Sequence, residues 1–596
     1  MRQFLRSRFR PRESVHDYIG VLVPLEEAHL HSYSSRCGKA EFEQDRQGSD
    51  DAHINADVDY DEDEETALGA IFKSSESEGD GMLQMDAAEY TIEGLRQAVR
   101  KGELGRRWTE YELKSKLINK AIQDIGMGRY NWQLFVLCGF GWFADNLWMQ
   151  GVSLTLPSLS EEFGVTEKQV RYTTSSLYVG LSIGSALWGL GADIMGRRIA
   201  FNLTLLITSI FGTLAAYAPN WPAVCFLFAL MGTGVGGNLP VDGALFLEFL
   251  PDASSSLLTL LSVWWPVGQL VSSLFAWYFI TNWPADQGWR LFIATVGIVT
   301  FIMFLIRFGL FHLFESPKYL LSQDRQAEAV AVVHGIAYRN NKKTWLTEEV
   351  LDAVADGEGI EQAPVRVSAR SVLKQNLSSF SLSHIQPLFQ NRKLGLTTAL
   401  IWFCWASIGM GYPLFNAFLP QYLSHGGAEV SVAARESVTT TSAETYQNYA
   451  IISVVGVPGS LLAAYLVDQD SPFLGRKGTL AISTFVSAVF LYFFVAFGTT
   501  PTAQLFFTSV EAFCQNIMYG VLYAFTPEIF PAPVRGAATG VASFLNRVMG
   551  LLAPLLAANA PGDGTTAPIY LSAALILAAF MGMVLIPIET RGRQRL

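Results

Sequence analysis

The chain has 596 residues and a formal net charge of −11, and half of its residues are hydrophobic. Acidic runs such as 57–65 gather before residue 125, and no basic stripe follows them, so nucleic acid is excluded as a partner. The five cysteines show no paired spacing, which argues against a disulfide framework, a zinc site or any other metal centre. No cofactor is expected.

Residues 1–88 are polar, acidic and low in aromatic content, which predicts a disordered N-terminal tail. The acidic serine cluster 74–80 resembles a phosphorylation site, so a kinase that acts on the tail is one expected partner. A merely solvated tail is the alternative. Residues 89–130 are helical in pattern and mixed in charge, and we expect them to form a cytoplasmic helical lead-in.

From residue 131 the sequence divides into apolar runs of about 20 residues, the length that a helix needs to cross a bilayer. The predicted spans are 132–156, 170–191, 199–218, 222–246, 256–280 and 290–312, then 395–420, 446–467, 478–498, 502–525, 536–558 and 567–588. This pattern predicts an all-α integral membrane protein with twelve transmembrane helices. Its six-helix bundles occupy 131–313 and 395–590, a cytoplasmic loop fills 314–394, and a short tail covers 591–596.

Basic residues near the span ends predict the orientation in the membrane. Arg197 and Arg198, Arg392 and Lys393, and Arg476 fall on one side of the twelve-span arrangement. Because cytoplasmic loops are enriched in lysine and arginine, that side is predicted to be cytoplasmic, with both termini on it. The plasma membrane and an endomembrane, such as that of a vacuole or vesicle, both fit.

The two halves of the sequence repeat short motifs at equivalent places. Asp193 and Gly196-Arg-Arg198 follow span 2, whereas Asp468 and Gly475-Arg-Lys477 follow span 8. Glu248-Phe-Leu-Pro follows span 4 in the same way that Glu528-Ile-Phe-Pro follows span 10. This correspondence predicts two six-helix repeats around a central path.

These motifs also resemble a known family. Gly189-x-x-x-Asp-x-x-Gly-Arg-Arg198, Glu315-Ser-Pro-Lys-Tyr-Leu320 and Pro527-Glu-Ile-Phe-Pro-x-x-x-Arg-Gly536 together look like the sugar-transporter-like branch of the major facilitator superfamily. Within that branch, 127–135, 141–148 and 236–242 are similar to the group of synaptic-vesicle-protein-two-related proteins, organic ion transporters and nicotinate carriers. The resemblance implies a twelve-helix transporter, which we expect to be a monomer.

Three charged residues lie deep within predicted spans, where each needs a partner or a water-filled cavity. Asp145 on span 1 and Glu511 on span 10 are candidate proton carriers, with an ion pair or a helix cap as the alternative. Arg547 on span 11 lies in a context similar to organic anion transporters, which implies contact with a substrate carboxylate. A structural ion pair of Arg547 with Glu511 or Asp145 is the alternative.

Aromatic and amide residues recur on the spans expected to line the central path, and they suit a flat organic ligand held by stacking and hydrogen bonds. For any single tryptophan, packing in the core or against lipid is the alternative. With Asp145, Glu511 and Arg547, the predicted substrate site contains Trp142, Asn238, Gln269, Trp402, Tyr412, Asn416, Gln515 and Tyr519.

The repeated motifs also predict a gate. Asp242 and Glu248 lie toward the cytoplasmic end of span 4, where ion pairs with Arg197 and Arg198 would close the path and break as the halves rock. A topology signal is the alternative for the two arginines. The predicted gating residues are Asp193, Gly196, Arg197, Arg198, Asp242, Glu248, Asp468, Arg476, Glu528 and Arg535.

Together these features predict a secondary active transporter, or symporter, for a small organic anion such as a monocarboxylate, coupled to protons and working by alternating access. A sugar or an organic cation is the alternative substrate, and a non-transporting membrane receptor or vesicle protein is the alternative class. No nucleotide-binding motif is present, so ATP is not the energy source. We do not expect an enzyme, because no nucleophile and base or metal cluster appears outside the membrane.

Overall fold

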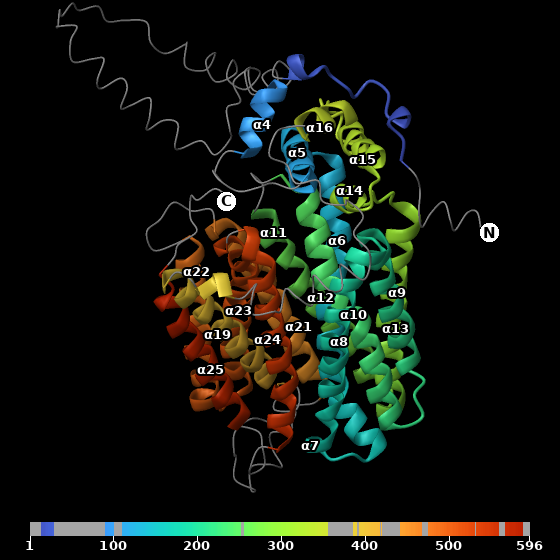
Figure 1. The fold of residues 1–596 in the computed structure, drawn as a ribbon. Coiled ribbons are helices and arrows are strands. Elements are labelled where there is room, and N and C mark those ends of the chain that lie inside the picture. The colour runs from blue at the N-terminus through green and yellow to red at the C-terminus, as the bar shows by residue number, and fades with distance from the viewer. Residues whose placement is uncertain are drawn as a thin grey trace, which may run out of the picture. The chain divides into compact units, whose positions relative to one another are not determined.

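The computed structural model describes residues 13–28, 90–100, 110–251, 256–355, 386–389, 392–417, 419, 442–467, 475–530, 532–559 and 567–587 (Figure 1). The serine cluster 74–80 lies outside these residues. The chain forms two compact units. The first contains Met1–Asn131, Phe249–Ser254 and Pro317–Val367, and the second contains Trp132–Glu248, Ser255–Ser316 and Ser368–Leu596.

The first unit is a cluster of short helices around α5. Helix α5 (Glu110–Ile125) buries Leu113, Leu117, Ile118, Ala121 and Ile122, the stripe expected of an amphipathic helix with one face in a core. Around it pack α14 (Pro317–Ser322), α15 (Gln326–Arg339) and α16 (Glu348–Ala355), and α4 (Ile92–Arg100) packs on α5 and α16.

An N-terminal segment completes the first unit. The backbone amide of Val23 donates to the Thr344 carbonyl at 3.1 Å, and the Thr344 amide donates to the Val21 carbonyl at 3.0 Å. Both valines are buried, and the turn η1 (Val15–Asp17) packs on α15. Residues far apart in the sequence therefore share one core.

Lys114 joins three elements of the first unit. Its Nζ lies 2.7 Å from Glu110 Oε1, 2.7 Å from Asp352 Oδ1 and 2.7 Å from Gln326 Oε1. Burial lowers the pKa of Lys114, but the hydrogen bonds to the two carboxylates outweigh burial and raise it overall. Burial raises the pKa of Asp352, but the bonds from Lys114 and Gln326 outweigh it and leave that pKa lowered.

Replacing Lys114 with methionine should destabilise the first unit by about 1–2 kcal/mol, because the stranded carboxylates remain partly exposed. The stabilisation that the Lys114–Asp352 ion pair gives to the folded state is complete above the pKa of Asp352 in the unfolded chain. It is lost as pH falls through the lowered pKa of Asp352 in the folded protein. It is also lost as pH rises through the raised pKa of Lys114. Hydrogen exchange of α5 and α16 followed against pH, with the exposed Lys343→Met as control, measures the loss of stability at low pH and at high pH. Equal exchange in the two variants would contradict the assignment.

The second unit contains the long helices. They are α6 (Arg129–Phe163), α8 (Tyr172–Met195), α9 (Arg197–Ala215), α10 (Trp221–Phe249), α12 (Trp264–Asn282), α13 (Ala285–Leu305), α19 (Arg392–Asn416), α21 (Ser442–Val467), α22 (Arg476–Phe497), α23 (Pro501–Ile529), α24 (Ala532–Asn559) and α25 (Ala567–Leu585). Among the described residues, nine helical segments are long and apolar enough to cross a membrane, and α6, α8 and α23 complete the twelve.

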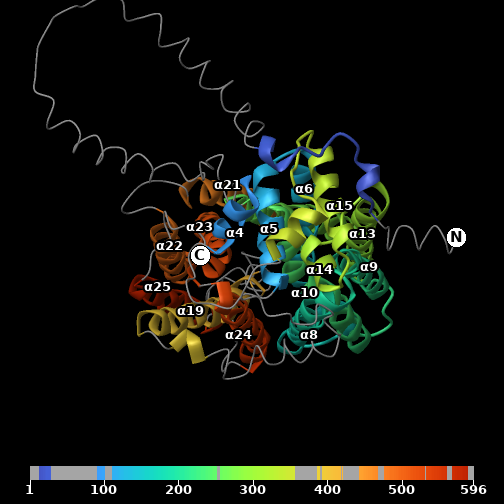
Figure 2. The ribbon, with the colours of Figure 1, turned by 45° about the horizontal axis from the view of Figure 1, so that its top comes forward.

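These helices form two bundles within the second unit (Figures 1 and 2). In the first bundle, α13 packs along α9 and α12. In the second, α19 packs along α24 and α25, while α23 packs along α21 and α22. The bundles meet where α12 lies against α21 and α8 against α24.

The sequence repeat reappears in the backbone. Gly196 precedes α9 with φ 104°, and Gly475 precedes α22 with φ 95°, conformations that L-residues with a Cβ rarely adopt. Each glycine lets the chain turn directly into a helix whose first residue is an arginine, Arg197 or Arg476. The two halves therefore place an arginine at equivalent positions, at what we call the basic end of the second unit.

Candidate functional site

A cavity with about 820 Å³ of atom-free space, part of it open solvent, lies between the two bundles of the second unit. Helices α6, α8, α10 and α12 contribute from the first bundle, and α19, α23 and α24 contribute from the second. Its lining residues are Asp145, Asn146, Met149, Tyr178, Leu181, Val235, Leu239, Trp265, Gln269, Gly409, Tyr412, Pro413, Gln515, Asn516, Tyr519, Tyr523, Asn546 and Arg547.

The cavity contains one carboxylate and one guanidinium. Asp145 on α6 is buried, and its Oδ1 accepts a hydrogen bond from Asn238 Nδ2 at 3.0 Å. Arg547 on α24 makes no hydrogen bond or ion pair with any residue that the structure describes. Neither Asp145 nor Glu511 is paired with it, so its guanidinium is available to the cavity.

Aromatic rings form one wall of the cavity. Trp265 on α12 packs edge-on against Tyr519 at 6.2 Å and against Tyr523 at 5.1 Å between ring centroids. Tyr412 on α19 meets Tyr519 at 5.4 Å. Rings from three helices and both bundles therefore offer a π-surface to a flat ligand.

Amide groups cross-link this wall. Gln269 Nε2 donates to Asn146 Oδ1 at 2.9 Å and to the Tyr412 hydroxyl at 3.2 Å, which links α12 to α6 and α19. On α23, Gln515 Oε1 accepts from Asn416 Nδ2 at 3.3 Å. The polar side chains of the cavity are thus held in place before a ligand arrives.

Glu511 lies just outside the cavity lining. It is 2% exposed, and Ser487 Oγ donates to its Oε1 at 3.5 Å. On α23 it precedes Gln515, Tyr519 and Tyr523 at four-residue intervals, so it continues the stripe that lines the cavity. Glu511 is therefore a buried carboxylate one helical turn beyond the cavity.

Six of the predicted substrate-site residues line the cavity, four lie next to it, and Trp402 lies away from it on α19. Trp142 stacks behind Trp265 at 4.7 Å between centroids, Asn238 supports Asp145, and Asn416 supports Gln515. Trp402 donates from its indole nitrogen to the Ala538 carbonyl at 3.0 Å. The residues in the cavity are Asp145, Gln269, Tyr412, Gln515, Tyr519 and Arg547.

Tyr178, Tyr523, Asn146 and Asn546 also line the cavity, although the sequence did not indicate them. Asn146 adjoins Asp145 and Asn546 adjoins Arg547. Both asparagines could therefore have been predicted as sequence neighbours of the charged residues in the cavity. Tyr523 continues the four-residue stripe of α23 and could have been found in the same way.

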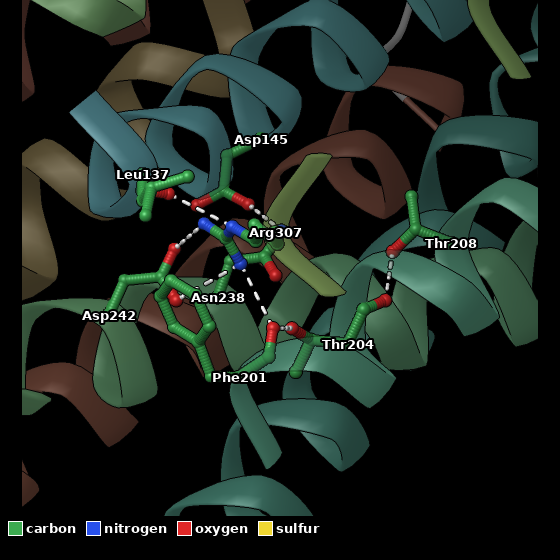
Figure 3. A network of polar contacts seen from close by, with 8 residues as sticks. All are labelled: Leu137, Asp145, Phe201, Thr204, Thr208, Asn238, Asp242 and Arg307. Carbon is green, nitrogen blue, oxygen red and sulfur yellow. Dashed lines mark hydrogen bonds and ion pairs between the residues drawn. The ribbon is translucent and has the colours of Figure 1, made fainter. Parts of the chain in front are cut away.

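A buried ion pair lies in the first bundle, beside Asp145 (Figure 3). Arg307 and Asp242 both have fully buried side chains, and Arg307 Nη2 lies 2.7 Å from Asp242 Oδ2. The sequence predicted a partner for Asp242 among Arg197 and Arg198. Asp242 instead pairs with Arg307, because it lies nearly two helical turns before Glu248 on α10, deeper in the bundle.

The basic end carries a matching ion pair in each half. Arg197 Nη1 lies 2.6 Å from Glu248 Oε1, and Arg476 pairs with Glu528. Glu315 accepts from the backbone amides of Arg197 and Arg198 at 2.9 and 3.3 Å, at the start of α9. Asp468 and the side chains of Asp193 and Arg535 fall outside the described part of the chain.

Burial raises the pKa of Glu315, and the backbone amides of Arg198, Ser316 and Arg197 offset only part of this rise. This carboxyl belongs to the Glu-Ser-Pro motif, which the sequence indicated only as a family signature. Its position explains the motif, because Glu315 supplies an acceptor to the orphan amides at the start of a helix that has no side-chain cap.

Comparison with known proteins agrees with this architecture. The Major Facilitator Superfamily profile matches residues 134–554. A siderochrome iron transporter of Ceriporiopsis subvermispora is 43% identical over 497 residues, which cover 82% of this chain and 92% of that protein. The synaptic vesicle 2-related protein of Bos taurus is 27% identical over 522 residues, covering 85% of this chain and 88% of its own.

Solved structures share the fold. The xylose transporter XylE from E. coli, in a partially occluded, inward-open conformation, superposes with a TM-score of 0.57 at 16% identity. The match covers 78% of this chain and 99% of that one. The predicted all-α, multi-pass membrane fold with two six-helix bundles is confirmed, as is the predicted resemblance. The chain belongs to the major facilitator superfamily.

Proposed function

We propose that this transporter carries a small organic anion, in the first place a monocarboxylate with a flat ring, and that protons drive it. The observation that carries the proposal is Arg547, whose guanidinium lines the cavity without an ion-pair partner among the described residues. A guanidinium stays charged in a low-dielectric site and offers two parallel donors to a carboxylate. The tyrosine and tryptophan wall supports a flat ring beside that carboxylate.

Two buried carboxylates are the proposed proton carriers. Asp145 lies in the cavity with Arg547, and Glu511 lies one turn beyond it on α23. A carboxyl group that gains a proton loses its charge, so protonation of Asp145 removes a repulsive charge from a cavity that must accept an anion. This relation supports uptake of substrate together with a proton.

The paired contacts at the basic end are the proposed gate. Arg197 with Glu248 joins α9 to α10, and Arg476 with Glu528 joins α22 to α23, at equivalent places in the two repeats. A shift of these helices within each bundle during alternating access can therefore break each pair. We place this end in the cytoplasm, together with both termini, because lysine and arginine gather there.

Exchanging the partners tests the gate. Arg197→Glu should lower transport roughly tenfold, because Glu248 then faces a like charge, and Arg197→Glu with Glu248→Arg should recover most of the rate. Initial uptake rates at equal protein in the membrane measure this effect. A double exchange as poor as the single one would leave the two arginines as a topology signal.

Uptake into reconstituted vesicles tests the substrate class. Radiolabelled benzoate should accumulate when the lumen is made alkaline, and accumulation should collapse with a protonophore. Labelled xylose and tetraethylammonium, in parallel vesicles, report the sugar and cation alternatives, and vesicles without protein report leakage. Uptake of xylose or tetraethylammonium with no benzoate uptake would overturn the proposal.

A relative named as a siderochrome iron transporter supplies a further rival cargo. A ferric siderochrome added in excess should leave benzoate uptake unchanged if a small carboxylate is the substrate. Iron accumulation without benzoate accumulation would replace the proposed cargo. Absence of flux for every probe would favour the receptor or vesicle-protein alternative.

A further inference from the structure

The carboxylate of Asp145 is held from α10. Asn238 Nδ2 donates to Asp145 Oδ1 at 3.0 Å, and Asn238 Oδ1 has no hydrogen-bond partner in the described structure. The amide is therefore not fixed by a second bond of its own side chain. The placement and rotation of α10 decide whether Asn238 reaches Asp145.

Helix α10 is weakened where that placement is set. Pro240 lies between Asn238 and Asp242 and has no backbone amide to donate to the preceding turn. Asn238 and Asp242 are four residues apart, so they share one face of α10, the face that meets α6. A side-chain anchor at Asp242 can replace the rigidity that Pro240 removes.

Arg307 provides this anchor (Figure 3). Besides its ion pair with Asp242, Arg307 donates from Nε to the Leu137 carbonyl at 2.9 Å and from Nη1 to the Phe201 carbonyl at 2.9 Å. Its guanidinium also lies 3.7 Å from the centre of the Phe201 ring. One guanidinium therefore fastens α10 to α6 and α9.

The backbone around Arg307 is unusual as well. Arg307 sits in the π-helical turn Ile306–Leu310 that follows α13. Such turns are rare and recur at functional sites because the wider turn re-aims a side chain. Here the turn places a charged side chain at complete burial, which a bundle without a use for the charge would avoid.

We propose that Arg307 and Asp242 are positioning residues, which hold Asn238 against Asp145 and so set the pH at which Asp145 takes up its proton. The proposal rests on the proton-carrier role given to Asp145 in the proposed function. Neither Arg307 nor Asp242 lines the cavity, so they act on a substrate only through Asn238 and Asp145.

Other groups also face Asp145 and must be controlled. The charge of Arg547 on α24 interacts with Asp145 across the cavity, and the hydroxyl of Tyr523 on α23 is also close enough to interact with it electrostatically. Asp242 and Arg307 carry opposite charges, so their electrostatic effects on Asp145 oppose each other. Removing Asp242 and Arg307 together leaves the net charge unchanged. If the pH at which Asp145 takes up its proton changes in that double variant, the change therefore reports mainly that Asn238 is no longer held in position.

Infrared difference spectroscopy of the purified full chain in lipid tests the proposal without a substrate. The protonated-carboxyl band that Asp145→Asn removes is followed against pH. In Asp242→Asn with Arg307→Gln, the half-point of this band should rise by roughly one unit, since the carboxylate loses a hydrogen bond. Asn238→Leu should give the same shift, and combining all three changes should add nothing.

Two further variants separate positioning from general loosening. Arg307→Lys keeps the charge beside Asp242 but loses the planar bonds to Leu137 and Phe201, so it should shift the half-point part of the way. Glu162→Gln with Arg290→Gln removes another ion pair of the first bundle, at 2.6 Å, and should leave the half-point unchanged. This control reports the effect of losing an ion pair elsewhere in the same bundle.

The outcomes are distinct. A half-point that stays at the wild-type value in both the double variant and Arg307→Lys, while Asn238→Leu shifts it, overturns the positioning role alone. A carboxyl band that Asp145→Asn leaves intact removes the proton-carrier role of Asp145, and this inference falls with it.

Discussion

Arg547→Ala should reduce benzoate uptake into vesicles by roughly 100-fold, the largest loss expected from a single change in the cavity. Stranding a charge that is paired in a desolvated site costs about 2–5 kcal/mol, and every 1.4 kcal/mol is a factor of ten. In the substrate-bound state the stranded group is the carboxylate of the substrate. Initial rates over a range of benzoate concentrations measure the loss.

Arg547→Lys separates charge from geometry. The ammonium keeps the positive charge but cannot give two parallel donors, so we expect an intermediate loss of about tenfold. Arg392→Ala, an exposed arginine at the start of α19, is the matched control and should transport like the wild type. Wild-type benzoate uptake by Arg547→Ala would end the role assigned to this residue.

The sequence predicted the twelve-helix architecture because each signal behind it was local. Apolar runs of bilayer length need no knowledge of tertiary contacts, and the two repeats of Gly-Arg could be compared directly. Span ends were less predictable. The first span was expected to end at 156, but α6 continues through Pro157 to Phe163, since a proline inside a membrane helix is tolerated when neighbours satisfy the freed carbonyl.

The cavity was predictable only in part. Charge depth in a span identified Asp145 and Arg547, because burial of a charge is costly wherever it occurs. Which tryptophan faces the cavity depends on helix rotation. Trp142 was expected to line it, but Trp142 stacks against the far side of Trp265, which does line the cavity. Arg307 escaped notice because it lies at the end of a span, where an arginine is normally read as a topology signal.

Gly141→Ala should unfold the first bundle or destabilise it by about 3–5 kcal/mol. An added Cβ would overlap Asp242 Oδ2, lie 2.8 Å from Asp242 Cγ and lie 3.0 Å from Arg307 Nη2. The ion pair cannot move aside freely, since both side chains are fully buried and Arg307 is also bonded to Leu137 and Phe201. Breaking a buried pair leaves uncompensated charge, which accounts for the expected cost.

Gly243→Ala is the matched control, on α10 directly after Asp242. A Cβ there meets only Trp142 at 3.8 Å, an ordinary contact, so thermal unfolding should stay near the wild-type midpoint. Adding Asp242→Ala and Arg307→Met to Gly141→Ala removes the overlap together with both charges, and should recover much of the lost stability. If Gly141→Ala unfolds at the wild-type temperature, α6 and α10 do not approach as closely as this pair requires. If the triple variant is no better than the single one, the cost lies in the α6 backbone and not in the ion pair.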